Sequence, residues 1–203
     1  RAKSKGVTFL ALTDHDSVAG LARAKAVADV EGIQLINGIE LSAKWGKIGV
    51  HVLGLNIDPD HPVMVAGIEQ QTRARAERAE LIDQRLSKLG IKGSLAGARR
   101  LAGEGTLGRP HFAQFMVDEG VVASHAAAFK KYLGAGKPGD VKNVWPDMAV
   151  VIKWIRAAGG VAVLAHPDKY KLTRTKQRGL VSSFADAGGE ALEVISGRQN
   201  TGD

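Results

Sequence analysis

Short apolar runs that end in polar residues recur near the start of the chain. Residues 7–12 are rich in strand-forming side chains and are followed by the polar residues 13–16. Apolar residues at helical spacing predict a helix over residues 17–31, and strands are predicted over 34–41 and 50–55. Alternating strands and helices with short connections indicate an α/β fold, which commonly places its functional residues at the carboxyl ends of strands.

The pattern changes in the middle of the chain, where one apolar stripe follows a long charged helix up to Leu89. Shorter helices are predicted over residues 94–103, 110–118 and 124–133. The α/β pattern then resumes, with a helix over residues 147–158 and strands over 161–165 and 191–195. We therefore expect one α/β layer in two parts, residues 1–66 and 144–203, separated by an all-helical insertion at 67–143.

Composition narrows the class of protein. The 203 residues are 44% hydrophobic, which is enough to fill a core, and no run of about 18 apolar residues is present of the kind that a membrane span requires. The absence of cysteine leaves His, Asp and Glu as the side chains that can hold a metal. It also fits a cytoplasmic protein.

The net charge of +7 indicates an anionic partner, and the charge is unevenly placed. Residues 67–143 contain 13 Lys and Arg against 8 Asp and Glu, whereas the rest of the chain has 15 against 13. Aromatic residues make up only 5% of the chain, so a platform on which nucleic-acid bases stack is poorly supported. Phosphate is therefore the group that we expect the protein to recognise.

Candidate metal ligands stand at or beside the predicted strand ends, namely Asp14, His15, Glu40, His51 and His166. A single histidine is more often a hydrogen-bonded structural residue, and Glu40 alone could be a solvated strand end. Their common placement favours a metal site, because Mn²⁺, Zn²⁺ and Fe²⁺ accept mixed imidazole and carboxylate ligands. A carboxylate can bridge two ions, and Glu40 is the natural bridge.

A second candidate group lies at a predicted helix start in the insertion. Arg109 has a planar fork that suits phosphate, and the free N–H groups at the helix start beside His111 favour anions. The alternative is that Arg109 is a surface residue and His111 a polar group on the helix face. His61, next to Pro62, and His125, after Ser124, stand at predicted helix starts and are expected to be surface or capping residues. Lys130 and Lys131 are expected to form a solvated helix face.

Four segments together resemble the PHP (polymerase and histidinol phosphatase) superfamily of metal-dependent phosphoesterases. They are Thr13-Asp14-His15-Asp16, Gly38-Ile39-Glu40, His51-Val52-Leu53-Gly54-Leu55 and Ala165-His166-Pro167. The insertion, with Gln70-Gln71-Thr72, Arg109-Pro110-His111-Phe112-Ala113 and Phe129-Lys130-Lys131-Tyr132-Leu133, resembles the nucleoside 3′,5′-bisphosphate phosphatase and 5′-to-3′ exoribonuclease branch. The resemblance implies a distorted (β/α)7 barrel that holds two or three divalent ions, with Mn²⁺ expected first and Zn²⁺, Fe²⁺ or Mg²⁺ as alternatives.

The resemblance also implies a role for each candidate residue. Glu40 would be shared by two ions, His51 and His166 would bind one of them, and His15 would bind a third. Asp14 would orient a ligand or contact metal through water, whereas Asp16 is expected to be a helix-start residue. The implied substrate is a nucleoside 3′,5′-bisphosphate or a short 5′-phosphorylated RNA, whose second phosphate Arg109 and His111 would bind.

Two parts of the superfamily pattern are missing from the sequence. An opening His-x-His strand with Ser-Asp-Gly and a closing Gly-Ser-Asp-x-His segment are not found. We therefore expect a barrel that is incomplete at both ends and a chain that is inactive alone, with the activity assigned to a longer parent. No membrane or protein partner is implied.

Two alternatives to this function stay open. One is a phosphatase like histidinol phosphatase, which the helical insertion disfavours. The other is a degenerate, non-catalytic binding module of the same superfamily. The retention of all five candidate ligands favours catalysis over the binding module.

Overall fold

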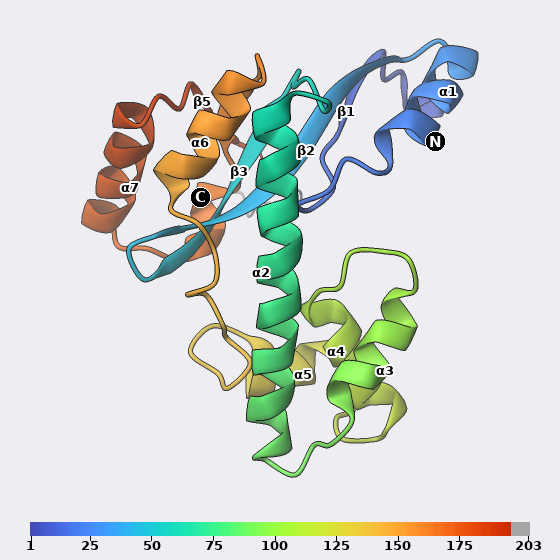
Figure 1. The fold of residues 1–203 in the computed structure, drawn as a ribbon, viewed down its shortest axis with the longest axis vertical. Helices are drawn as coiled ribbons and strands as arrows, with labels where there is room; N and C mark the ends of the chain where they lie inside the picture. The colour runs from blue at the N-terminus through green and yellow to red at the C-terminus, as the bar shows by residue number, and fades with distance from the viewer. Residues whose placement is uncertain (196–203) are drawn as a thin grey trace. The chain divides into compact units, whose positions relative to one another are not determined.

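The computed structural model describes residues 1–195, and it contains a five-stranded sheet with the strand order β1-β2-β3-β4-β5 (Figure 1). The strands are β1 (Phe9–Leu12), β2 (Gln34–Trp45), β3 (Ile48–Leu55), β4 (Val161–Leu164) and β5 (Ala191–Leu192). The two outer pairs are parallel, whereas β2–β3 and β3–β4 are antiparallel. The predicted α/β class is confirmed, and closure into a barrel stays a prediction.

The pair β2–β3 is a hairpin that the sequence analysis did not predict. Its two-residue turn begins at Gly46, whose φ of 58° is easily adopted by glycine. The expectation that Glu40 and His51 lie at strand ends is wrong, because both stand inside their strands. Because β2 and β3 are antiparallel, their carboxyl ends lie at opposite edges of the sheet and cannot form one site. Glu40 and His51 instead meet in the middle of the hairpin. In the register, Ser42 lies opposite His51 and Glu40 lies opposite Leu53.

The alternation of side chains along the hairpin separates a core face from a polar face. Ile39, Leu41 and Val52 are fully buried, and they belong to the same core as residues of helices α6 (Met148–Ala157) and α7 (Arg174–Asp186). Burying a large aliphatic side chain contributes about 1.5–3 kcal/mol. The side chains between these core residues point to the other face of the sheet.

Helix α1 (Leu21–Glu31) begins later than predicted, and the expected helix-start role of Asp16 is wrong. Asp16 is 3% exposed and turns the chain with a φ of 53°. Its carboxylate accepts hydrogen bonds from the backbone N–H of Ser42 (2.6 Å) and from the Ser42 hydroxyl (2.8 Å). Asp16 is therefore used to fasten the loop after β1 to β2, so it does not cap α1.

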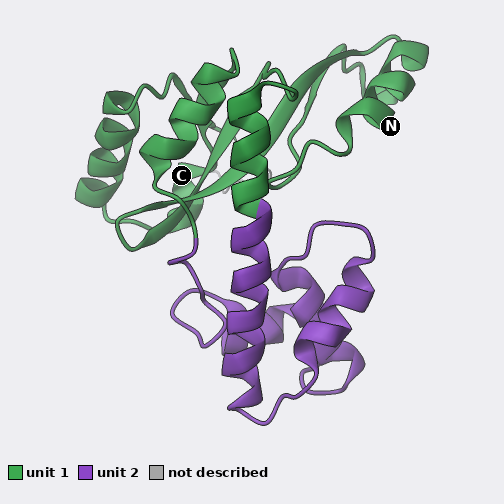
Figure 2. Ribbon diagram, viewed as in Figure 1, with its two compact units in different colours: residues 1–71, 145–203 green, residues 72–144 purple. Residues whose placement is uncertain are grey.

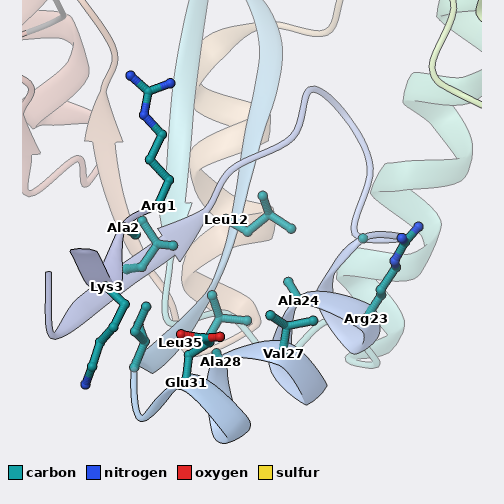
Figure 3. A pocket seen from close by; sticks show the side chains of 13 residues that line it. Arg1, Ala2, Lys3, Leu12, Arg23, Ala24, Val27, Ala28, Glu31 and Leu35 are labelled. Carbon is teal, nitrogen blue, oxygen red and sulfur yellow. The ribbon is translucent and has the colours of Figure 1, made fainter. Parts of the chain in front are cut away.

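A cavity of about 440 Å³ lies between α1 and the β1 end of the sheet (Figure 3). Leu10, Leu12, Val27 and Leu35 line it, with Arg23 among the charged residues around them. Leu10 on β1 is 42% exposed.

The chain divides into two compact units (Figure 2). The sheet unit comprises residues 1–71 and 145–203, and the helical unit comprises residues 72–144. Helix α2 (Pro62–Ser87) begins in the first unit and continues into the second. From the sequence, these boundaries were expected at residues 67 and 143.

The helical unit contains the predicted short helices, and its described residues form no strand. They are α3 (Ser94–Ala102), α4 (Arg109–Asp118), α5 (His125–Ala128) and the π-helical turn η2 (Phe129–Leu133). Leu86, Phe112 and Met116 are at most 1% exposed and form the centre of a separate core. The sheet unit also has two short 3-10 helices, η1 (Lys3–Lys5) and η3 (Pro167–Tyr170).

Candidate metal centre

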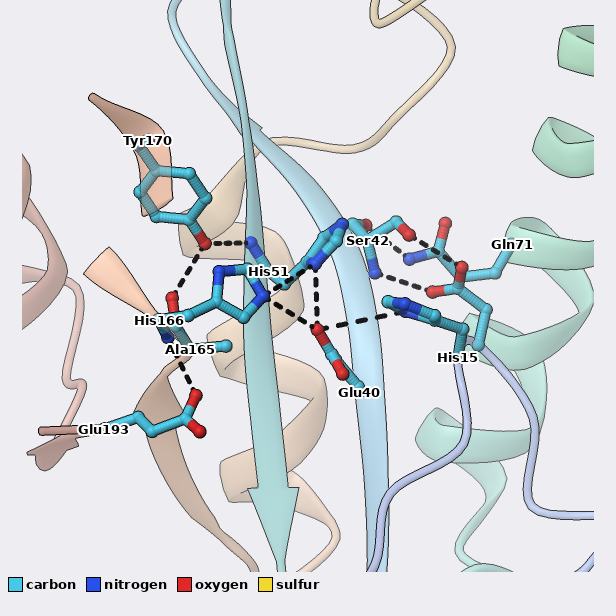
Figure 4. A network of polar contacts seen from close by, with 10 residues as sticks. His15, Glu40, Ser42, His51, Gln71, Ala165, His166, Tyr170 and Glu193 are labelled. Atoms are coloured by element: carbon cyan, nitrogen blue, oxygen red, sulfur yellow. Dashed lines mark hydrogen bonds and ion pairs between the residues drawn. The ribbon is translucent and has the colours of Figure 1, made fainter. Parts of the chain in front are cut away.

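Three imidazoles converge on one carboxylate oxygen of Glu40 (Figure 4). The Oε1 atom of Glu40 lies 2.8 Å from His51 Nδ1, 3.2 Å from His166 Nε2 and 3.9 Å from His15 Nδ1. The His51 and His166 nitrogens are themselves 3.2 Å apart. The structure therefore brings together residues that are up to 151 positions apart in sequence.

Each of these side chains is positioned by a different part of the sheet unit. Glu40 and His51 point to the same face of the β2–β3 hairpin, as their register requires. His15 follows β1 and forms an isolated parallel bridge with Glu40. His166 lies two residues after the end of β4 and has a left-handed backbone, with φ 32° and ψ 56°.

The electrostatics keep the Glu40 carboxylate ionised. Burial by itself would raise the pKa of Glu40, but hydrogen bonds with His166 and His51 and the charge of His15 outweigh it and hold the pKa far below its usual range. The hydrogen bond to Glu40 raises the pKa of His166, against an opposing effect of burial. An ionised carboxylate among imidazoles is ready to receive a cation.

The donor atoms fit a divalent metal in spacing and in chemistry. The donor atoms of His15, Glu40 and His51 all lie within 4.8 Å of one another. Ligands about 2.1 Å from a shared ion stand roughly 3–3.5 Å apart, so modest side-chain movement would bring these atoms into coordination. Imidazole and carboxylate together suit Zn²⁺, Mn²⁺ and Fe²⁺. His15 lies in one group with Glu40 and His51.

Asp14 lies beside this group, and it is not among the grouped donors of the described chain. Its side chain is exposed, and its carboxylate lies against Gly20 at the start of α1. Its backbone carbonyl accepts a hydrogen bond from Glu40 N (3.1 Å). In this structure Asp14 contributes to the site through its backbone.

Arg109 and His111 stand in the helical unit, at the start of α4. Arg109 Nη1 donates to the Leu133 carbonyl (2.9 Å) and lies 3.8 Å from Asp140 Oδ1. Burial lowers the pKa of Arg109, and the charge of Asp140 opposes that effect. His111 Nδ1 accepts a hydrogen bond from Gly108 N (3.0 Å), which closes the helix start. Both residues thus have structural contacts, and their role toward phosphate stays a prediction.

The expectations for the other polar residues agree with the structure. His61 Nδ1 accepts a hydrogen bond from Val63 N (3.3 Å) at the start of α2, which confirms a capping residue. His125 is exposed and bonds to the Gln114 side chain at 2.7 Å. Lys130 and Lys131 are exposed, as expected for a solvated helix face.

Several residues of the site had no role assigned from the sequence, although Gln71 belongs to a motif of the predicted insertion. Gln71 on α2 is fully buried and donates to the Ser42 carbonyl (2.6 Å). Tyr170 and Glu193 contact the backbone beside His51 and His166 (Figure 4). Burial raises the pKa of Tyr170, so its hydroxyl stays protonated. Ser42 could have been found from its strand spacing to Glu40, whereas Tyr170 and Glu193 carry no local signal.

A carboxylate that gathers three imidazoles on an α/β sheet defines a metallohydrolase type of site. No family model matches the chain. It is 42% identical over 204 residues to the 3′,5′-nucleoside bisphosphate phosphatase of Chromobacterium violaceum, covering 100% of this chain and 72% of that protein. It is 44% identical over 202 residues to the 5′-3′ exoribonuclease Rnm of Escherichia coli, covering 98% and 69%.

A solved structure agrees with these relatives. The chain superimposes with a TM-score of 0.88 on an amidohydrolase from Chromobacterium violaceum with bound sulfate and no metal, at 41% identity, covering 95% of this chain and 68% of that chain. The chain therefore belongs to the PHP-type phosphoesterase family that includes the 3′,5′-nucleoside bisphosphate phosphatases and 5′-3′ exoribonucleases. The resemblance seen in the sequence is confirmed. Among the described helices, none has the length and apolar character needed to cross a bilayer.

Proposed function

We propose that this protein is a metal-dependent phosphoesterase that hydrolyses the 3′-phosphate of nucleoside 3′,5′-bisphosphates and trims 5′-monophosphorylated RNA from its 5′ end. The observation that carries the proposal is the convergence of three imidazole nitrogens on Glu40 Oε1. The names of the relatives in Chromobacterium violaceum and Escherichia coli support the two substrate classes. The cysteine-free sequence supports a cytoplasmic location.

We propose that His15, Glu40, His51 and His166 hold divalent ions, two or three per site, with Mn²⁺ first and Zn²⁺, Fe²⁺ or Mg²⁺ as alternatives. Such ions supply Lewis acidity and make water a competent nucleophile near neutral pH. Glu40 contributes a permanent negative charge, since its pKa is held far below the usual range. The imidazoles must be neutral to act as ligands, so the raised pKa of His166 makes metal binding dependent on pH.

We further propose that Arg109 and His111 bind the second phosphate of the substrate. The 3.8 Å between Arg109 Nη1 and Asp140 Oδ1 is longer than a hydrogen bond, so the two side chains form an ion pair without a hydrogen bond. Arg has a planar fork that binds phosphate in a bidentate manner. Binding of that phosphate would explain a preference for bisphosphates over plain monoesters.

The test is phosphate release from adenosine 3′,5′-bisphosphate by the full-length protein with Mn²⁺. We expect Glu40→Ala to lower the rate by about 100-fold or more, because it removes the shared oxygen of the site. The matched control is Glu190→Ala, an exposed glutamate of the same unit, which should keep the wild-type rate. Equal rates in wild type and Glu40→Ala would remove Glu40 from the mechanism.

The same assay separates the alternatives. Release from a 5′-phosphorylated oligoribonucleotide would support the trimming activity. Release of phosphate from histidinol phosphate but not from the bisphosphate would favour the hypothesis of a phosphatase like histidinol phosphatase. Binding of the bisphosphate without release from any of these substrates would favour a non-catalytic module.

A further inference from the structure

The peptide bond between Ala165 and His166 is held on both of its polar groups by side chains from other segments (Figure 4). Its carbonyl accepts a hydrogen bond from the Tyr170 hydroxyl (2.9 Å). Its N–H donates to Glu193 Oε2 (2.8 Å). With both groups fixed, the plane of this peptide has little freedom to rotate.

Tyr170 also connects this peptide to the neighbouring strand. Its hydroxyl accepts the backbone N–H of His51 at 2.8 Å while it donates to Ala165. The Tyr170 ring packs edge-on against His166, with ring centroids 5.3 Å apart. One hydroxyl group thus ties together the backbones that carry His51 and His166.

The backbone of His166 needs such support. Its φ of 32° lies in the left-handed region, which residues other than glycine rarely adopt. Pro167 follows it and further restricts its conformation. Glu193 is brought to the His166 N–H by the stretch that follows β5, where Glu193 N donates to the Leu164 carbonyl (3.0 Å).

We propose that Tyr170 and Glu193 are positioning residues that clamp the Ala165–His166 peptide and so hold His166 Nε2 beside Glu40 and His51 for metal binding. The proposal rests on the proposed metal-dependent function. It assigns two residues that lie outside the group of candidate ligands. Each acts on the backbone that carries His166.

The test measures Mn²⁺ affinity and the Co²⁺ absorption spectrum of the full-length protein. We expect Tyr170→Phe and Glu193→Ala each to weaken Mn²⁺ binding by about 10- to 100-fold. Glu193→Gln should stay within about threefold of wild type, because its amide oxygen can still accept the His166 N–H. At saturating Co²⁺, the spectra of Tyr170→Phe and Glu193→Ala should resemble that of His166→Ala, which a purely structural defect would not produce.

Two conservative controls remove the same groups elsewhere. Tyr132→Phe in the helical unit and Glu190→Gln near β5 should leave both measurements unchanged. If Tyr170→Phe does not fold, Glu193→Ala and its rescue by Glu193→Gln decide the question. Unchanged Mn²⁺ affinity and Co²⁺ spectra in folded variants would overturn the clamp. Failure of the wild type to bind any of these ions would instead overturn the proposed function.

Discussion

The sheet unit and the helical unit each enclose a poorly exposed carboxylate, and the two are surrounded differently. In the helical unit, Asp140 is 7% exposed and lies 2.8 Å from Lys142 Nζ and 3.8 Å from Arg109 Nη1. It also accepts a hydrogen bond from Gly136 N (2.7 Å). In the sheet unit, Glu40 is 16% exposed and has only imidazoles as its ionisable neighbours in the contacts described.

This difference determines whether the residues around Glu40 or those around Asp140 can exchange protons for a metal cation. Lysine and arginine stay charged near neutral pH and offer no lone pair to a metal. Histidine can lose its proton in this pH range and then becomes a ligand. The Glu40 cluster can therefore replace protons by a divalent cation, whereas the Asp140 cluster is already neutralised by fixed charges.

The difference between the Glu40 and Asp140 clusters is tested most directly by removing the charge of each carboxylate while keeping the shape of the side chain. We expect Glu40→Gln to weaken Mn²⁺ binding and lower phosphatase activity by about 100-fold. Asp140→Asn should leave Mn²⁺ affinity within about threefold and lower the free energy of unfolding by about 1–3 kcal/mol. Metal titration and thermal unfolding of both variants are the measurements. Equal losses of metal affinity would show that the two clusters do not differ in this way.

A smaller effect is expected when Arg109 is removed. Arg109→Ala should raise KM for the 3′,5′-bisphosphate by about tenfold, the loss of one charge-assisted phosphate contact, with a smaller change for a 3′-monophosphate. Steady-state kinetics on both substrates measure the split. Arg100→Ala, an exposed arginine of the same unit, is the control. An equal change in KM for both substrates would indicate that Arg109 supports the helical unit and does not bind the second phosphate.

Asp16 provides a third carboxylate, which accepts hydrogen bonds from two neutral donors, the backbone N–H and the hydroxyl of Ser42. Asp16→Asn keeps one acceptor oxygen but turns an NH₂ group toward the second donor. We expect a loss of about 1–2 kcal/mol in the free energy of unfolding and a change in Mn²⁺ affinity below about threefold. Chemical denaturation and metal titration test this. A large loss of metal affinity at unchanged stability would assign Asp16 a direct part in the metal site.

The smallest expected effect is a pH dependence of the metal-free protein. The pKa of His166 is raised in the folded state, so its contribution to stability is complete below about pH 6.5, its ordinary value, and is lost as pH rises through the folded pKa. The free energy of unfolding should therefore fall by about 1 kcal/mol or less toward alkaline pH. The contribution of Glu40 changes with pH in the opposite direction. Because the folded-state pKa of Glu40 is lowered, its contribution to stability is complete above its ordinary pKa and is lost as pH falls through the lowered pKa.

Thermal unfolding at several pH values, with and without Mn²⁺, measures this effect. His166→Gln should flatten the metal-free dependence. Mn²⁺ should bind more tightly as pH rises, since it displaces protons. A metal-free stability that rises with pH above 6.5 would contradict the assignment.

The sequence allowed the fold class and the helical insertion to be predicted, because both depend on local periodicity. The alternation of buried Ile39, Leu41 and Ala43 with Glu40 and Ser42 was also readable, and it places both polar side chains on one face. The hairpin turn at Gly46-Lys47 was missed, although glycine between two strands is a known signal.

Other features could not be predicted, since they depend on contacts between distant segments. The His51–Tyr170 hydrogen bond spans 119 positions, and the His166–Glu193 bond spans 27. The left-handed backbone of His166 is held by these contacts, and a histidine before proline carries no local signal for it. Similarly, Asp16 was expected to start a helix, because its hydrogen-bond partner Ser42 lies 26 positions away and leaves no local signal of the contact.

The short turn at Gly46-Lys47 bears on how this family can change in evolution. Gaining or losing one residue inside the hairpin would turn Glu40 and His51 to opposite faces, since side chains alternate along a strand. β3 and β4, by contrast, are joined by a long connection whose length does not determine which of their residues pair. Lengthening such a connection costs little free energy. An insertion in the β3–β4 connection, where residues 72–144 stand, is therefore expected to leave the pairing of β3 with β4 intact.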